Sequence, residues 1–263
     1  CLIYEKKASI AKIILNKPET GNTLDLDLAK ELYAASLDAA SDNDIKALIL
    51  TANGKLFCGG GNLKFLLSKK KEVKKTLLEM TMYFHGAISR MARMSAPVIV
   101  GVNGTSGGGG FSLAITGDII YAVKDAKFTL AYTNAGLSPD GSSTYYLPRI
   151  VGMKRAKELM LTNRLLSAEE AHDMGLIDLV VNSNEELNEA INKQAEVFSE
   201  GPVNAYKSVK KLLSESFNNG LESQMEIESI HISNNAQSKD GIEGLTAFSE
   251  KRKPKFICKL WLN

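Results

Sequence analysis

Short runs of apolar and β-branched residues alternate with longer segments of helical periodicity through the first two-thirds of the chain. The short runs are typical of buried strands, while apolar residues recurring every three or four positions indicate one face of a helix. Strands are predicted at residues 10–15, 47–51, 98–102 and 118–123, and helices at 24–40 and 72–94. This alternation predicts an α/β fold with crossover connections between strands.

The pattern changes in the last third of the chain. Residues 167–174 begin with Ser167 and carry two glutamates in the first turn, as a capped helix does, and residues 176–181 are predicted to form a strand. Further helices are predicted at 184–198, 202–217, 221–236 and 242–251. We therefore expect a core of residues 1–200, followed by a helical region of residues 201–263 that packs on the core or on another subunit.

The composition is that of an ordinary globular protein, and 263 residues are enough to bury a sizeable core. With 32 Lys and Arg residues against 30 Asp and Glu residues, no one-sided charge favours nucleic acid. No apolar run approaches the ~20 residues that span a bilayer, so we expect neither a nucleic acid nor a membrane partner. Three cysteines without Cys-x-x-Cys spacing argue against disulfides and zinc, and favour a cytoplasmic location.

Two glycine-rich segments each follow a predicted strand. The first is FCGGGNL at residues 57–63, and the second is NGTSGGGG at residues 103–110, just before a predicted helix. Glycines at this position allow the backbone to approach a ligand and direct free N–H groups at it, and the helix dipole favours negative charge. The P-loop pattern is absent. The segments predict a site for an oxyanion or a phosphate, with a glycine turn that binds nothing as the alternative.

Six segments in order carry a resemblance to a known family. They are LNKPETGNTL, LFCGGGNLK, APVIVGVNGTSGGGGFSLAITGDIIYA, AKFTLAYTNAGLSPDGSSTYYLPRIVG, LLSAEEAHDMGLID and EGLTAFSEKRKPKF. From about residue 10 to residue 256 the chain resembles the crotonase family, the enoyl-CoA hydratases and isomerases. The resemblance implies a crotonase-like spiral of ββα units with a C-terminal helical trimerisation region, forming a homotrimer or a dimer of trimers. It also implies an acyl-CoA substrate, with coenzyme A as part of the substrate and no separate cofactor.

The resemblance further implies a role for particular residues. The backbone N–H groups of Gly61 and Gly109 are expected to bind the thioester oxygen, where such donors stabilise the charge of an enolate. The adenine is expected against the first glycine segment, the phosphates near basic side chains, and the C-terminal tail over the nucleotide of a neighbouring subunit. The residues expected to bind coenzyme A are Lys17, Gly59, Gly60, Asn62, Leu63, Phe248 and Lys251.

The hydratases resemble one another in two glutamates that position water, and here those positions are Ser112 and Tyr132. Neither side chain can act as a carboxylate base, so hydratase chemistry is not favoured. Asp140 remains, in a Ser-Pro-Asp-Gly segment at residues 138–141 that resembles the isomerases. One carboxylate can remove a proton beside the thioester carbonyl and return it two carbons away. The alternative for Asp140 is a capping role at the next helix.

His85 suggests a second reaction. It lies twelve residues before Pro97, a spacing that resembles hydrolytic aryl-CoA dehalogenases, which also have an aromatic residue at the position of Tyr132 and an aspartate at that of Asp140. In that branch the aspartate attacks the ring and the histidine activates water. The alternatives are a partly buried histidine without a catalytic role, or a protein that binds acyl-CoA without turnover. His172 has no second ligand at metal spacing, so no metal site is expected.

Overall fold

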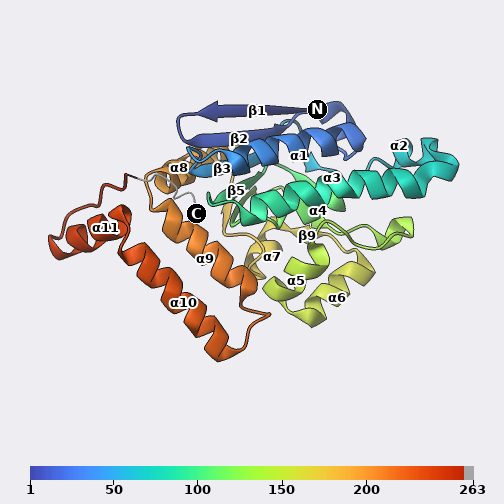
Figure 1. The fold of residues 1–263 in the computed structure, drawn as a ribbon. Helices are drawn as coiled ribbons and strands as arrows, with labels where there is room; N and C mark the ends of the chain where they lie inside the picture. The colour runs from blue at the N-terminus through green and yellow to red at the C-terminus, as the bar shows by residue number, and fades with distance from the viewer. Residues whose placement is uncertain (258–263) are drawn as a thin grey trace.

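The computed structural model describes residues 1–257, and within them the strands form two sheets (Figure 1). The larger sheet contains β1 (Leu2–Lys7), β2 (Ile10–Leu15), β3 (Ala47–Ala52), β5 (Val98–Val102), β7 (Ile119–Val123) and β10 (Leu179–Val181), in that order. The smaller sheet contains β4 (Leu56–Cys58), β6 (Thr105–Gly107), β8 (Lys127–Thr129) and β9 (Leu166–Ser167). Apart from the antiparallel pairs β1–β2 and β8–β9, neighbouring strands are parallel.

A repeating unit connects the two sheets. A strand of the larger sheet is followed by a strand of the smaller sheet and then by helical structure, in the pairs β3–β4, β5–β6 and β7–β8. The helices of the core are α1 (Leu26–Ser41), α2 (Leu63–Ser68), α3 (Val73–Arg93), α4 (Gly109–Ala114), α5 (Ser143–Val151), α6 (Met153–Thr162), α7 (Ala168–Asp173) and α8 (Asn184–Ser199). The expected α/β fold with a spiral of ββα units is confirmed.

The apolar runs that predicted strands occupy the centre of the larger sheet. Every residue of β3 and β5 is buried, and α8 packs against both strands. Parallel strands covered in this way are apolar along their whole length instead of alternating. Helix α3 contributes a buried stripe to the same core, spaced as one helical face requires. Its buried residues are Thr76, Met80, Phe84, Ala87, Ile88 and Met91.

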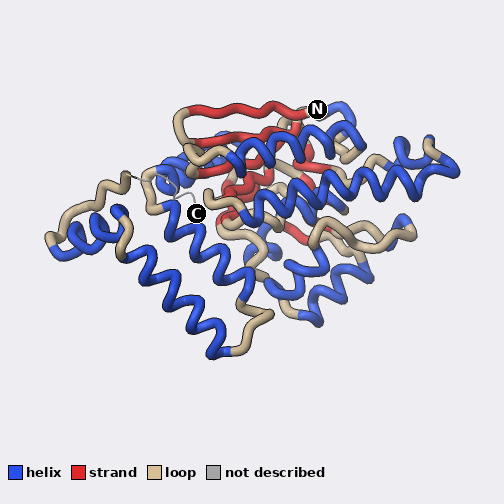
Figure 2. The backbone as a smooth tube through the Cα atoms, viewed as in Figure 1, coloured by secondary structure: helices blue, strands red, loops and turns tan. Residues whose placement is uncertain are grey.

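Three helices, α9 (Val203–Glu215), α10 (Leu221–Ala236) and α11 (Lys239–Ser249), extend away from the sheets (Figure 1), and Figure 2 shows helices without strands in this region. Lys210 joins α9 to the core, because its ammonium contacts the Asp118 carboxylate at 2.6 Å and the carbonyl oxygens of Met91 and Ala96. In contrast, α10 has no buried residue. Within residues 1–257, no helix is both long and apolar enough to cross a bilayer.

Some boundaries differ from the predictions. The strand expected at 176–181 contains only Leu179–Val181, because Leu176 and Ile177 are buried in the loop before β10 and are apolar for that reason. Helix α11 begins at Lys239 instead of residue 242, since the Ser238 side chain caps it by accepting the Gly241 N–H. Strand β1 was not predicted, because its second half is an exposed run of charged residues at the sheet edge.

Candidate active site

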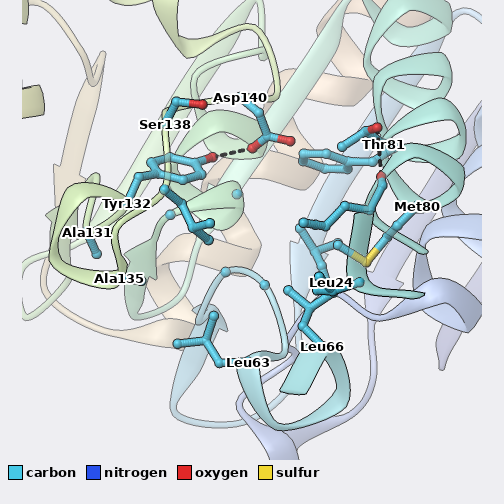
Figure 3. A pocket seen from close by; sticks show the side chains of 18 of the residues that line it. Leu24, Leu63, Leu66, Met80, Thr81, Ala131, Tyr132, Ala135, Ser138 and Asp140 are labelled. Carbon is cyan, nitrogen blue, oxygen red and sulfur yellow. Dashed lines mark hydrogen bonds between the residues drawn. The ribbon is translucent and has the colours of Figure 1, made fainter. Parts of the chain in front are cut away.

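A pocket of about 530 Å³ lies between the α2–α3 segment and the loop of residues 131–140 (Figure 3). The residues expected to perform chemistry meet here although the sequence separates them widely. Gly61, Gly109, Tyr132 and Asp140 all line the pocket, as do Gly59, Gly60 and Leu63 of the first glycine segment. The structure therefore brings both glycine segments and the candidate carboxylate to one cavity.

The backbone around Gly61 leaves its N–H group without a partner among residues 1–257. Gly61 forms a single parallel bridge with Leu24, in which the Leu24 N–H donates to the Gly60 carbonyl at 2.7 Å. The Asn62 N–H completes the bridge by donating to the Leu24 carbonyl, also at 2.7 Å. Both hydrogen bonds use neighbours of Gly61, so its own N–H remains available on the pocket wall.

Gly109 offers a second N–H group for a different reason. It is the first residue of α4, and the first N–H groups of a helix have no acceptor within the helix. The preceding N–H, that of Gly108, already donates to the Thr129 carbonyl at 3.1 Å. The available donors of this turn therefore begin at Gly109, at the positive end of the helix dipole.

Close contact between the two glycine segments explains why glycine is required. A Cβ atom on Gly60, whose φ is +90°, would lie 2.7 Å from the carbonyl oxygen of Gly107. A Cβ atom on Gly110 would lie 2.2 Å from the carbonyl oxygen of Cys58. Side chains at these positions would push the segments apart, and with them the N–H groups of Gly61 and Gly109.

Asp140 is held by side chains from two other elements. The Tyr132 hydroxyl donates to Asp140 Oδ1 at 2.7 Å (Figure 3), and His85 Nε2, on α3, lies 3.0 Å from Asp140 Oδ2. The backbone carbonyl of Asp140 accepts from the hydroxyls of Ser112 at 2.8 Å and Ser143 at 2.9 Å. Both the main chain and the carboxylate are therefore fixed, with the carboxylate at the pocket wall.

The capping interpretation of Asp140 is wrong. The N-cap of α5 is Ser142, which has φ of 71° and makes no capping hydrogen bond through its side chain. The preceding residue, Gly141, has φ of +60°, and a Cβ atom there would lie 2.7 Å from both Phe84 and Ser112. This tight, left-handed turn directs the Asp140 carboxylate toward Tyr132 and His85 instead of toward the helix.

Tyr132 acts as a hydrogen-bond donor to the carboxylate. Burial raises the pKa of its hydroxyl, and the negative charge of Asp140 raises the same pKa further. The phenol therefore stays protonated through the neutral pH range. Its oxygen also lies 2.9 Å from Ser112 Oγ, so the two residues in the glutamate positions of the hydratases form one hydroxyl network beside Asp140.

Some expected ligands of coenzyme A lie elsewhere or have other partners in this chain. The Lys17 ammonium contacts the Asp25 carboxylate at 2.6 Å, so it already has a counterion. The Asn62 side chain accepts the Phe65 N–H at 3.0 Å and caps α2. Phe248, on α11, and Lys251, just after it, are exposed and lie at the opposite end of the molecule from α2 (Figure 1). Neither residue reaches the pocket of its own chain.

Cys58 and His172 lie outside the pocket wall. Cys58 is fully buried, and burial raises the pKa of its thiol to about 12, which suits a small apolar residue and not a nucleophile. His172 is half exposed, and residues 1–257 contain no cluster of His, Cys, Asp and Glu side chains that could hold a metal. Cys258 lies outside the described residues.

Sequence reasoning missed the apolar wall of the pocket. Leu24, Leu66, Met80 and Phe84 line it beside Asp140 and the glycine segments. The helical spacing of Met80 and Phe84 indicated a buried face, but that spacing does not tell a pocket wall from the rest of the core. In the sequence, Ser112 was considered only as a position where the hydratases have a glutamate. Ser112 lies one helical turn after Gly109 on α4, and this spacing in the sequence could have placed its hydroxyl near the pocket.

Comparison with known proteins agrees with this geometry. The sequence profile described as "Enoyl-CoA hydratase/isomerase" matches residues 5–259. The chain belongs to this family. It is 32% identical to 1,2-epoxyphenylacetyl-CoA isomerase of Escherichia coli, with 98% of each chain covered. It is 30% identical to 4-chlorobenzoyl coenzyme A dehalogenase-2 of an Arthrobacter species, with 85% of this chain and 81% of the relative covered.

A solved structure from Mycobacterium abscessus, described as an enoyl-CoA hydratase/isomerase, gives the same result. It superposes with a TM-score of 0.92 at 30% identity, covering 98% of this chain and 99% of the other. The two relatives are named for different reactions, an isomerisation and a dehalogenation. Membership of the family therefore does not fix the reaction of this chain, which depends on the side chains around its own pocket.

Proposed function

We propose that this family member is an isomerase that moves the double bond of an enoyl-CoA from position 3 to position 2, or performs a related ring isomerisation. The observation that carries the proposal is the placement of Asp140. Its carboxylate lies at the wall of the pocket that Gly61 and Gly109 also line, and the two glutamate positions of the hydratases hold Ser112 and Tyr132.

In the proposed reaction the thioester oxygen accepts hydrogen bonds from the N–H groups of Gly61 and Gly109. Asp140 removes a proton from C2, and the electrons of that C–H bond form a dienolate whose negative charge rests on the thioester oxygen. The protonated Asp140 then returns a proton to C4, and the double bond forms between C2 and C3. The step consumes no water and no oxidant. One backbone donor of this kind typically contributes ~3 kcal/mol to the transition state.

The test is the conversion of a 3-enoyl-CoA, followed as the rise in conjugated thioester absorbance. Asp140→Asn keeps the size of the side chain but cannot take a proton, so we expect the rate to fall by about 10²–10⁴. The affinity for a saturated acyl-CoA should stay within a few-fold of the parent value. Asp38→Asn is a matched control, because Asp38 also accepts a tyrosine hydroxyl at 2.7 Å but lies on α1, outside the pocket wall. Parental turnover by Asp140→Asn would refute the assignment of the base.

A second candidate, hydrolytic dehalogenation of an aryl-CoA, is supported by the 3.0 Å contact between His85 Nε2 and Asp140 Oδ2. In that reaction Asp140 would attack the ring carbon that bears the halogen, halide would leave, and water activated by His85 would hydrolyse the resulting ester. His85→Gln should abolish turnover of a 4-halobenzoyl-CoA if this reaction is correct, and should leave isomerisation nearly unchanged otherwise. Release of halide from the parent enzyme distinguishes the two reactions directly.

Two further outcomes have distinct signatures. Hydration of a 2-enoyl-CoA would lower the conjugated absorbance instead of raising it, and would require a base other than the residues at positions 112 and 132. Binding of straight-chain, aryl and halogenated thioesters without turnover of any of them would indicate an acyl-CoA binder. In either case we expect coenzyme A thioesters to bind more tightly than the free acids, because the N–H groups and the nucleotide contacts recognise the thioester and its carrier.

A further inference from the structure

The walls of the pocket divide into two chemically different parts. One part contains Asp140, Tyr132 and the backbone of the two glycine segments. The other part lies between α2 and α3 and is made of aliphatic side chains, which we call the aliphatic arm: Leu63, Leu66, Val73, Leu77, Leu78 and Met80. The contact with coenzyme A that the family resemblance implies for Leu63 concerns its backbone, whereas the arm contains its side chain. In Figure 3, Asp140 and Tyr132 face the pocket from one side, while Leu63 and Leu66 lie on the opposite side.

The polar residues along the aliphatic arm offer little to a polar ligand. The Thr81 hydroxyl donates to the Leu77 carbonyl of its own helix at 2.8 Å (Figure 3). Lys74 also lines the pocket, but its side chain is exposed. A pantetheine amide along this wall gains no hydrogen bond from the aliphatic side chains, whereas an alkyl chain buries apolar surface against them. The arm is therefore unsuited to the pantetheine chain and suited to a hydrocarbon.

Shape favours a chain over a ring. The aromatic side chains of the pocket wall are Phe84 and Tyr132, and both lie beside the reacting end: Tyr132 contacts Asp140, and Phe84 lies next to Gly109 and Gly141. The arm itself has no aromatic face on which a ring could stack. Its walls are leucines, a valine and a methionine, which offer apolar contact to an alkyl chain, and the methionine can adapt its shape to that chain. At its outer limit Leu78 is 64% exposed, so the arm is open to solvent.

We infer that the substrate carries a linear aliphatic acyl chain of medium length or longer, and that the chain beyond the reacting carbons lies in the aliphatic arm between α2 and α3. This inference rests on the proposed function, because it takes the thioester oxygen to lie at Gly61 and Gly109. Burial of one methylene improves binding roughly fourfold. Because the arm is open to solvent, affinity should rise with each of several added carbons and then become constant. A longer chain should not reduce affinity sharply, because its end can extend into solvent.

The experiment measures kcat/KM for a series of linear 3-enoyl-CoA substrates from six to fourteen carbons, with a phenyl-substituted 3-enoyl-CoA for comparison. We expect kcat/KM to rise two- to fourfold per added methylene up to about ten carbons, and the ring substrate to be poorer than the linear chain of equal carbon number. A preference for six carbons, or for the ring, would overturn the inference.

Leu77→Trp places a bulky ring in the arm, one helical turn before Thr81 and away from Asp140. It should reduce kcat/KM for the longer chains by at least tenfold and for the six-carbon substrate by much less, and an unchanged circular dichroism spectrum and Tm show that the variant folds. Leu161→Trp is the matched control, because Leu161 is 73% exposed on α6 and is absent from the pocket wall. An unchanged chain-length profile in Leu77→Trp would contradict the inference.

A binding measurement separates this inference from the proposed function. If no 3-enoyl-CoA of any length is converted, the isomerase proposal fails, but calorimetry with saturated acyl-CoAs of four to twelve carbons still tests the arm. Affinity that rises with chain length in the parent and in Leu161→Trp, but not in Leu77→Trp, supports the aliphatic chain. Affinity that is independent of length overturns it.

Discussion

Replacing Tyr132 with phenylalanine removes one hydroxyl from the pocket and tests how Asp140 is held. That hydroxyl donates to Asp140 Oδ1 at 2.7 Å and contacts Ser112 Oγ at 2.9 Å. Ser112 keeps the Asp140 carbonyl as an acceptor at 2.8 Å, so the main chain of Asp140 stays fixed. Tyr132→Phe therefore removes one hydrogen bond from the Asp140 carboxylate. The other carboxylate oxygen keeps its contact with His85.

The size of the effect follows from this geometry. A hydrogen bond to a charged group contributes about 1.5–3 kcal/mol, and each 1.36 kcal/mol corresponds to a factor of ten in rate. The Asp140 side chain is 32% exposed, so water can replace part of the lost donor. We therefore expect the lower end of the range, a reduction of kcat for 3-enoyl-CoA isomerisation of about tenfold.

The assay compares kcat, from the rise in conjugated thioester absorbance, with the dissociation constant of a saturated acyl-CoA from calorimetry. Tyr132→Phe should lower kcat and leave the dissociation constant within about twofold. Tyr4→Phe is the control, because Tyr4 donates to Asp38 at the same distance of 2.7 Å, in strand β1 and outside the pocket wall. Parental kcat in Tyr132→Phe, or an equal loss in Tyr4→Phe, would refute the reasoning.

Three further predictions concern assembly and stability. We expect a trimer or a hexamer by light scattering at micromolar concentration, because α10 buries no residue within one subunit; a monomer would contradict this. Lys210→Met should lower the free energy of unfolding by about 1.5–3 kcal/mol in denaturant titrations, because it removes the buried counterion of Asp118, which is partly exposed and keeps the Val98 N–H as a donor, whereas Met at the exposed neighbour Lys211 should change it little. The Arg252 guanidinium lowers the pKa of Glu243 to about 2, so this pair stabilises the fold above pH 4.5 and the benefit disappears as the pH falls toward 2. The difference in Tm between the parent and Glu243→Gln should shrink over that range, and a difference independent of pH would contradict the assignment.

The elements predicted well from sequence are those with clear boundaries in the sequence. Helix α10 occupies residues 221–236 as predicted, beginning directly after Gly220, and β5 occupies 98–102 as predicted, as an apolar run between Pro97 and Asn103. Strands β4, β6 and β8 have three residues each and were not predicted. A three-residue strand has no measurable periodicity, and β6 also ends in glycine, which gives no strand signal.

For the candidate site, sequence reasoning located the segments but not their contacts. Gly61, Gly109 and Asp140 could be named from local patterns and a family resemblance. The contact between His85 and Asp140 joins residues 55 positions apart, and it depends on the left-handed turn at Gly141 and Ser142. A serine in that conformation is not a common choice, so the Asp-Gly-Ser pattern left a helix cap open as the alternative role of Asp140. The direction of the carboxylate became clear only from the packing of α3 against this turn.

Gly61 and Gly109 present main-chain N–H groups to the pocket, and this has a consequence for how such a protein changes over evolutionary time. A point mutation can replace Ser112, Tyr132, His85 or Asp140, but exchanging one side chain for another does not delete an amide hydrogen, proline excepted. The groups proposed to bind the thioester oxygen are therefore inherited with the chain path, while the side chains proposed to direct the reaction can change one at a time. In such a lineage, single substitutions can change the reaction while the backbone groups proposed to bind the substrate are kept.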